Sequence, residues 1–164
     1  MSIFKPNFYF DKVWDISPEF LKENQIKCLL LDVDNTLTFH DNPSIHDKAG
    51  LWLEDVKKSG VTALIISNNT PERVAPFCKS IGLDFVAHAR KPLSYGVTSA
   101  LKKFGFNKKD MLIVGDKIFT DILCGKFSRI KTALVVPFEL ENMPFFKVKR
   151  FLERIILRGK RNKK

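Results

Sequence analysis

Two aspartates, Asp32 and Asp34, stand two residues apart at the end of the apolar run 27–33. An extended chain would direct both carboxylates to the same face. Two carboxylates so close repel each other unless a cation lies between them or one takes a proton. Oxygen ligands of this kind suit Mg²⁺. The pair alone is equally well explained as two solvated acids in a turn, so the interpretation depends on further residues.

More polar residues follow other apolar runs. Ser67 comes directly after the run 61–66, Lys91 precedes Pro92, and Asp116 follows the run 111–114 through Gly115. Each has an ordinary structural explanation, because Ser67 and Asp116 could cap helices and a lysine is usually solvated. The chemical interpretation makes Asp116 a further oxygen ligand. It also gives Lys91 a fixed position near a helix N-terminus, where an anion binds.

The segments between these residues alternate between strands and helices. Ser17-Pro18-Glu19 predicts a short helix to about Glu23. The apolar patterns predict strands at 27–33, 61–66, 84–87, 111–114 and 132–136, and helices at 46–59, from Thr70 onward, at 93–104 and at 119–127. Strands that are apolar throughout are typical of parallel sheets covered on both faces. The aromatic-rich segment 1–16 shows no clear period.

This alternation predicts an α/β fold, a doubly wound (Rossmann-like) parallel sheet. Open α/β sheets bind ligands beyond the C-terminal ends of their strands. Four of the polar residues fall at that edge: Asp32, Ser67, Lys91 and Asp116. Their order along the chain is acid pair, serine, lysine, acid, and the ordered set is a much stronger signal than any member.

In this order the chain resembles the haloacid dehalogenase (HAD) superfamily of phosphatases. The resemblance covers residues 27–136, with Asp32-Val33-Asp34-Asn35-Thr36 as the first motif, Ser67 as the second, Lys91 as the third and Gly115-Asp116 through Asp121 as the fourth. It implies that Asp32 is a nucleophile that forms an aspartyl-phosphate. It also implies that Asp34 first protonates the leaving oxygen and then takes a proton from water.

The resemblance assigns the other residues as well. Mg²⁺ would be held by Asp32, the backbone carbonyl of Asp34 and Asp116, while Ser67 and Lys91 would bind the phosphoryl oxygens. Three residues would support the site without touching the substrate: Thr36, which braces the nucleophile loop, Asn68, and Asp121, which orients Lys91 or a metal-bound water.

The spacing between motifs leaves no room for a cap domain. One helix and one strand use most of the residues between Asp34 and Ser67, and the same holds between Ser67 and Lys91. An uncapped site suits a substrate that brings its own cover, such as a macromolecule or a membrane lipid. An oligomer that supplies a lid is the alternative.

Below the superfamily level the chain resembles the YqeG-type branch of subfamily IIIA, which includes phosphatidylglycerophosphate phosphatases. The resemblance rests on the aromatic start, Asp15-Ile16-Ser17-Pro18-Glu19-Phe20-Leu21, Asp34-Asn35-Thr36-Leu37, Ser67-Asn68-Asn69, Ala89-Arg90-Lys91-Pro92, Val114-Gly115-Asp116 and Thr120-Asp121. Lys117 and Arg129 depart from the branch, where Gln and Gly are usual. These departures lie outside the chemistry but weaken the transfer of a particular substrate.

Positive charge is concentrated at the C-terminus. Residues 147–164 carry nine Lys or Arg and one Glu, eight of the ten net positive charges of the 164-residue chain. Residues 144–164 are expected to form a basic amphipathic helix and tail. This helix would either bind an anionic bilayer surface or pack its apolar face against the rest of the protein. We expect residues 27–143 to form the phosphatase core and residues 1–26 an aromatic-rich segment with a short helix.

Neither a secretory signal nor an apolar run of transmembrane length is evident, and three scattered cysteines fit a reducing compartment. The expected location is therefore the cytoplasm, with peripheral contact to the inner face of the membrane. Rival interpretations are a phosphatase for a soluble sugar phosphate, nucleotide or phosphoprotein, and an RNA-binding or other interaction protein with a weak site. A phospho-accepting receiver domain is disfavoured because it lacks an acid equivalent to Asp34.

Overall fold

The computed structural model describes residues 3–39 and 42–138. The predicted basic helix and tail at 144–164 therefore lie outside the described residues. The described chain forms one sheet of six parallel strands in the order β1-β6-β5-β2-β3-β4. The strands are β1 (Phe8–Phe10), β2 (Cys28–Leu31), β3 (Thr62–Ile66), β4 (Asp84–Val86), β5 (Met111–Gly115) and β6 (Lys131–Val135).

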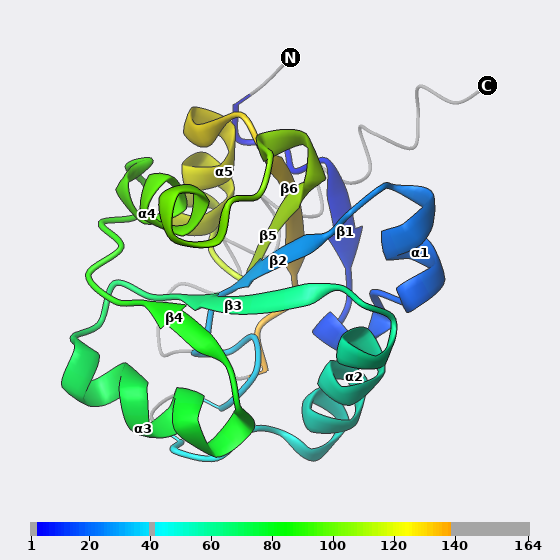
Figure 1. Cartoon of the computed structure of the whole chain (residues 1–164), viewed down its shortest axis with the longest axis vertical. Helices are drawn as coiled ribbons and strands as arrows, with labels where there is room; N and C mark the ends of the chain where they lie inside the picture. Colours follow the sequence, from blue (N-terminus) through cyan, green and yellow to red (C-terminus); the bar gives the residue numbers. More distant parts are fainter. Residues whose placement is uncertain (1–2, 40–41, 139–164) are drawn as a thin grey trace.

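Helices cover both faces of the sheet (Figure 1). The α-helices are α1 (Pro18–Glu23), α2 (Asp47–Lys58), α3 (Pro71–Ile81), α4 (Tyr95–Phe104) and α5 (Leu123–Ser128), with a π-helical turn, η3 (Ile118–Ile122), leading into α5. In Figure 1, α2 and α3 lie on one side of the sheet and α4 and α5 on the other. None of the described helices is both long enough and apolar enough to cross a bilayer.

Strand β2 shows how the sequence builds these layers. Leu29 and Leu31 belong to the core on the α2 and α3 side, whereas Cys28 and Leu30 belong to the core on the α4 and α5 side. Successive side chains of a strand point to opposite faces, so a strand covered on both faces must be apolar at every position. The predicted doubly wound α/β fold is confirmed.

The first strand was missed by the sequence analysis. Phe8–Phe10 adds an edge strand to β6, with Phe8 opposite Ala133 and Val135 opposite Phe10. Asn7 anchors the start of this strand, because its side-chain oxygen accepts a hydrogen bond from the Thr132 amide at 3.1 Å. Three half-buried aromatic residues show no alternation between apolar and polar, so periodicity could not reveal the strand.

Helix ends follow the local chemistry. The Ser17 hydroxyl accepts a hydrogen bond from the Phe20 amide at 3.1 Å, which confirms Ser17 as the cap of α1. Helix α4 begins at Tyr95, two residues after the predicted start at Leu93. Arg129 ends α5 with φ at 59°, a left-handed conformation that glycine adopts without strain.

The order of the strands identifies one place for a ligand. The chain passes outward from β2 through β3 to β4, then returns to place β5 on the other side of β2. Adjacent parallel strands whose connections run in opposite directions leave a crevice beyond their C-terminal ends. Asp32 follows β2 and Asp116 follows β5, so both predicted ligands flank this crevice.

Candidate active site

The loop after β2 is held by backbone hydrogen bonds. The Asp32 amide donates to the Val114 carbonyl of β5 at 3.0 Å. The Val33 carbonyl then accepts from the amides of residues 36, 37 and 38 at 3.2, 2.9 and 3.2 Å. Asn35 has φ at 59°, a left-handed conformation that asparagine tolerates well. This tight turn fixes Asp32 at the sheet edge.

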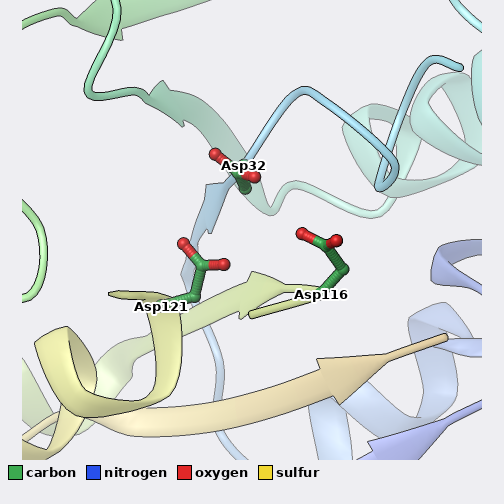
Figure 2. Close-up of side chains that lie close together, drawn as sticks. All are labelled: Asp32, Asp116 and Asp121. Atoms are coloured by element: carbon green, nitrogen blue, oxygen red, sulfur yellow. The ribbon is translucent and has the colours of Figure 1, made fainter. Parts of the chain in front are cut away.

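Three carboxylates gather at that edge. One oxygen from each of Asp32, Asp116 and Asp121 lies within 4.8 Å of the others. The three side chains come from the ends of β2 and β5 and from η3, and their carboxylates turn toward a common space (Figure 2). Asp121 is fully buried and Asp32 is only 9% exposed, so water screens their mutual repulsion poorly.

Lys91 offsets part of this negative charge. Its ammonium donates to Asp32 Oδ1 at 2.7 Å and to Asp121 Oδ1 at 2.6 Å. Burial lowers the pKa of Lys91, but the neighbouring Asp121 and Asp32 outweigh this and raise the pKa above its usual value. The two carboxylates therefore favour the charged form of Lys91. The three carboxylates and one ammonium leave two uncompensated negative charges when all are ionised.

Asp116 places a carboxylate oxygen in this cluster that could bind a cation. Its Oδ1 is buried and has no hydrogen-bond partner among the described residues. Burial, followed by repulsion from Asp32, raises the pKa of Asp116 to about 8. A buried carboxylate oxygen without a donor is costly unless a metal or a proton is bound. The donors, all hard oxygens, fit Mg²⁺, which Asp32 and Asp116 would hold.

Asn68 joins the second motif to the third. Its side-chain amide donates to the Lys91 carbonyl at 3.0 Å, and the Lys91 amide donates back to Asn68 Oδ1 at 2.7 Å. Ser67 itself is buried, and its hydroxyl oxygen accepts from the Asn69 amide at 3.1 Å. The Ser67 proton is thereby left to donate to an anion such as a phosphoryl oxygen.

Asp34 lies apart from the three clustered carboxylates. Strand β2 ends at Leu31, so Asp34 lies in the loop that follows the strand. Asn69 donates from its side-chain amide to Asp34 Oδ2 at 3.4 Å. Asp34 and Ser67 instead line a pocket of about 310 Å³. The carboxylate can therefore meet the part of a ligand that enters this pocket.

Gly115 is a residue whose importance the sequence analysis did not recognise. A Cβ at this position would lie 2.3 Å from the carboxyl carbon of Asp121. The buried Asp121 carboxylate thus occupies the space that any side chain on residue 115 would fill. Its Oδ2 accepts from the Lys117 amide at 3.1 Å, which closes the turn after β5. The Gly-Asp pair in the fourth motif is the signal that could have indicated this packing.

The structure thus brings Asp32, Lys91, Asp116 and Asp121 into one cluster, and it places Ser67 and Asp34 on a pocket. Asn68 and Asp121 both contact Lys91, and their supporting roles stay predictions. Thr36 is fully buried, but its hydroxyl has no hydrogen-bond partner among the described residues, so no such bond shows the predicted bracing.

Comparison with known proteins connects this geometry to an enzyme class. The model of the family described as mitochondrial PGP phosphatase matches residues 1–134. The chain is 33% identical over 160 residues to the probable phosphatase YqeG of Bacillus subtilis, covering 98% of this chain and 93% of that protein.

One further relative and one solved structure are less similar to this chain. A phosphatidylglycerophosphate phosphatase of Arabidopsis thaliana is 27% identical over 136 residues, which span 77% of this chain and 39% of the plant protein. The cobalt-bound deoxy-D-mannose-octulosonate 8-phosphate phosphatase of Haemophilus influenzae superposes with a TM-score of 0.56 at 17% identity, covering 78% of this chain and 76% of that one. At this low identity, the likeness to the Haemophilus influenzae structure shows a shared fold alone.

Proposed function

Because the chain belongs to the mitochondrial PGP phosphatase family, in subfamily IIIA of the HAD superfamily, we propose that it hydrolyses a phosphorylated lipid headgroup such as phosphatidylglycerophosphate. Membership makes the chain a HAD-type phosphatase. The observation that carries the reaction is the cluster in which Lys91 donates to Asp32, near a buried Asp116 oxygen that has no hydrogen-bond partner among the described residues.

The reaction we propose has two halves. In the first, a carboxylate oxygen of Asp32 attacks phosphorus, the ester P–O bond breaks, and Asp34 gives a proton to the departing alcohol oxygen. In the second, Asp34 takes a proton from a water molecule, whose oxygen attacks phosphorus. The bond between phosphorus and the Asp32 oxygen then breaks, and inorganic phosphate leaves.

The other residues hold the transferred group. The Ser67 hydroxyl and the Lys91 ammonium donate to phosphoryl oxygens, where charge spreads in the transition state. Asp121 and Asn68 fix Lys91 for this purpose through its side chain and its backbone. A bound Mg²⁺ supplies positive charge that offsets the charge of the phosphoryl group and of the carboxylates that hold it.

Two features support a lipid substrate. The described residues between β2 and β3, and those between β3 and β4, form one helix each, so no cap domain is inserted. Large apolar side chains are also exposed within or just after the motif segments: Phe39 (37%), Leu93 (59%) and Phe119 (65%). Exposed apolar side chains around an active site suit contact with a bilayer.

A substrate comparison tests this proposal. Phosphate release from phosphatidylglycerophosphate in mixed micelles would be measured with Mg²⁺ and with EDTA, beside sugar phosphates, nucleotides and a phosphopeptide. We expect kcat/KM for the lipid to exceed that for each soluble substrate by at least tenfold, with no release in EDTA. Faster release from a soluble phosphate would contradict the lipid proposal and identify that compound as the better substrate. Release in EDTA would contradict the metal site.

A further inference from the structure

The pocket beside Asp34 has a cationic side chain that the proposed reaction does not use. Arg73 lines it together with Asp34, Ser67, Val74 and Phe77. Of the described residues that line the pocket, Arg73 is the one with a positive charge. The volume of about 310 Å³ lies at the lower end of the range for small-molecule sites, about 300–1,000 Å³.

Packing of helix α3 fixes the backbone position of Arg73. Val74 and Phe77 are buried in the core, so the face of α3 that carries them is packed against the body of the protein. The Arg73 amide donates to the Thr70 carbonyl at 3.2 Å in the first turn of the helix. Arg73 is exposed, and its position on a packed helix keeps it at the pocket.

The role of Asp34 indicates which part of the substrate enters this pocket. In the proposed reaction Asp34 protonates the leaving oxygen, so the leaving alcohol must lie on the side of Asp34. Asp34 and Ser67 both line the pocket, so in the proposed reaction the pocket would take the alcohol that extends beyond the phosphoryl group bound by Ser67. Arg73 then meets the alcohol portion of the substrate.

We propose that Arg73 is the residue that recognises a second anionic phosphate carried by the leaving alcohol, and so selects substrates that have one. This inference rests on the proposed function and deepens it. An arginine guanidinium offers paired donors that match phosphate oxygens, which makes arginine well suited to recognise such a group. A phosphodiester in a lipid headgroup and a second phosphomonoester in a soluble bisphosphate share this chemistry.

The test compares substrates with one and with two phosphates. Glycerol phosphate has one, deacylated phosphatidylglycerophosphate adds the phosphodiester without acyl chains, and 1,3-propanediol bisphosphate adds a second monoester. Initial rates with Mg²⁺ would give kcat/KM for the wild type, Arg73→Gln and Arg73→Lys. Arg90→Gln is the matched control, because Arg90 is also exposed, stacks on Tyr95 and lies outside the residues that line the pocket.

We expect the wild type to prefer a two-phosphate substrate over glycerol phosphate by about tenfold or more, and Arg73→Gln to abolish this preference mainly through KM. Arg73→Lys should keep part of it, and Arg90→Gln all of it. The intact lipid in micelles would be measured as a further substrate. The two-phosphate substrate with the highest kcat/KM then identifies the source of the second phosphate.

Two results would overturn the inference. One is a wild type that releases phosphate from all three substrates with similar kcat/KM, and the other is an Arg73→Gln variant that keeps the preference. A purely structural role would lower kcat/KM equally for all substrates and would also contradict it. A wild type that releases no phosphate from any of them would instead overturn the proposed function itself, and this inference with it.

Discussion

Asn68 and Lys91 exchange two hydrogen bonds, one in each direction between the Asn68 side-chain amide and the Lys91 backbone. This pairing fixes the backbone from which the Lys91 ammonium reaches Asp32 and Asp121. The asparagine after Ser67 therefore connects the ends of two different segments of the chain. The position of the Lys91 ammonium therefore depends on Asn68, a residue that need not touch the substrate.

The variant Asn68→Ala should lower kcat by about tenfold to a hundredfold, because a small displacement of Lys91 misplaces the donor for the phosphoryl group. Initial rates and the thermal midpoint would be measured together. Asn24→Ala is the matched control, since the Asn24 side chain also makes one hydrogen bond to a carbonyl, at 2.9 Å, at the end of α1. Equal activity in Asn68→Ala and wild type would contradict the role of this pair.

Gly115→Ala should destabilise the protein by about 1–3 kcal/mol and remove most activity, because the new methyl group would displace the Asp121 carboxylate. Chemical denaturation and phosphate release measure the two effects. Gly50→Ala serves as the comparison: its Cβ would meet Ile45 at 3.7 Å, an ordinary contact, within helix α2. We expect Gly50→Ala to retain activity and stability; an equally tolerated Gly115→Ala would refute the packing argument.

The pKa of Asp116 gives the metal-free protein a pH dependence. Because this pKa is raised to about 8, the folded protein keeps a proton that the unfolded chain releases, and unfolding free energy should fall from pH 5 to pH 8. Burial raises the pKa of Asp121 in the same direction, although Lys91 opposes the shift. Mg²⁺ should therefore raise the thermal midpoint more at pH 8 than at pH 5.

Asp116→Asn provides the matching variant. It removes one carboxylate, so the midpoint without Mg²⁺ should depend less on pH and the response to Mg²⁺ should largely disappear. Differential scanning fluorimetry with Mg²⁺ and with EDTA measures both. A wild-type midpoint that Mg²⁺ leaves unchanged at pH 8 would show that the cluster holds no magnesium.

Bilayer contact around the site predicts a position-dependent effect of apolar residues. Leu93→Ser and Phe119→Ser should each weaken binding to vesicles that contain anionic lipid by up to about tenfold, since each removes an exposed apolar side chain near the motifs. Phe127→Ser is the control, because Phe127 is 51% exposed at the end of α5 that leads to the start of β6. Co-sedimentation measures binding, and equal loss in all three variants would contradict a bilayer-facing rim.

The sequence predicted the fold because a strand buried on both faces has to be apolar throughout, as Cys28–Leu31 and Met111–Gly115 are. Strand β1 escaped prediction because its three aromatic residues gain their strand conformation from pairing with β6. Such pairing is a tertiary contact that no local pattern records.

Those site residues were predictable that lie directly at the end of a strand, because the strand itself determines where they lie. Asp32 and Asp116 follow directly from β2 and β5. The hydrogen bonds of Asn68 to Lys91, and the packing of Asp121 against Gly115, depend on contacts between separate segments. Arg73 lies in an ordinary helical turn, and only the pocket shows what it faces.

The most direct test of the account is phosphate release by Asp32→Asn, a nearly isosteric change that removes the nucleophile. At saturating Mg²⁺ and phosphatidylglycerophosphate, we expect activity to fall by at least a thousandfold while the far-ultraviolet circular dichroism stays that of the wild type. A folded Asp32→Asn protein that releases phosphate at the wild-type rate would contradict nucleophilic catalysis by Asp32, and with it the mechanism proposed for this site.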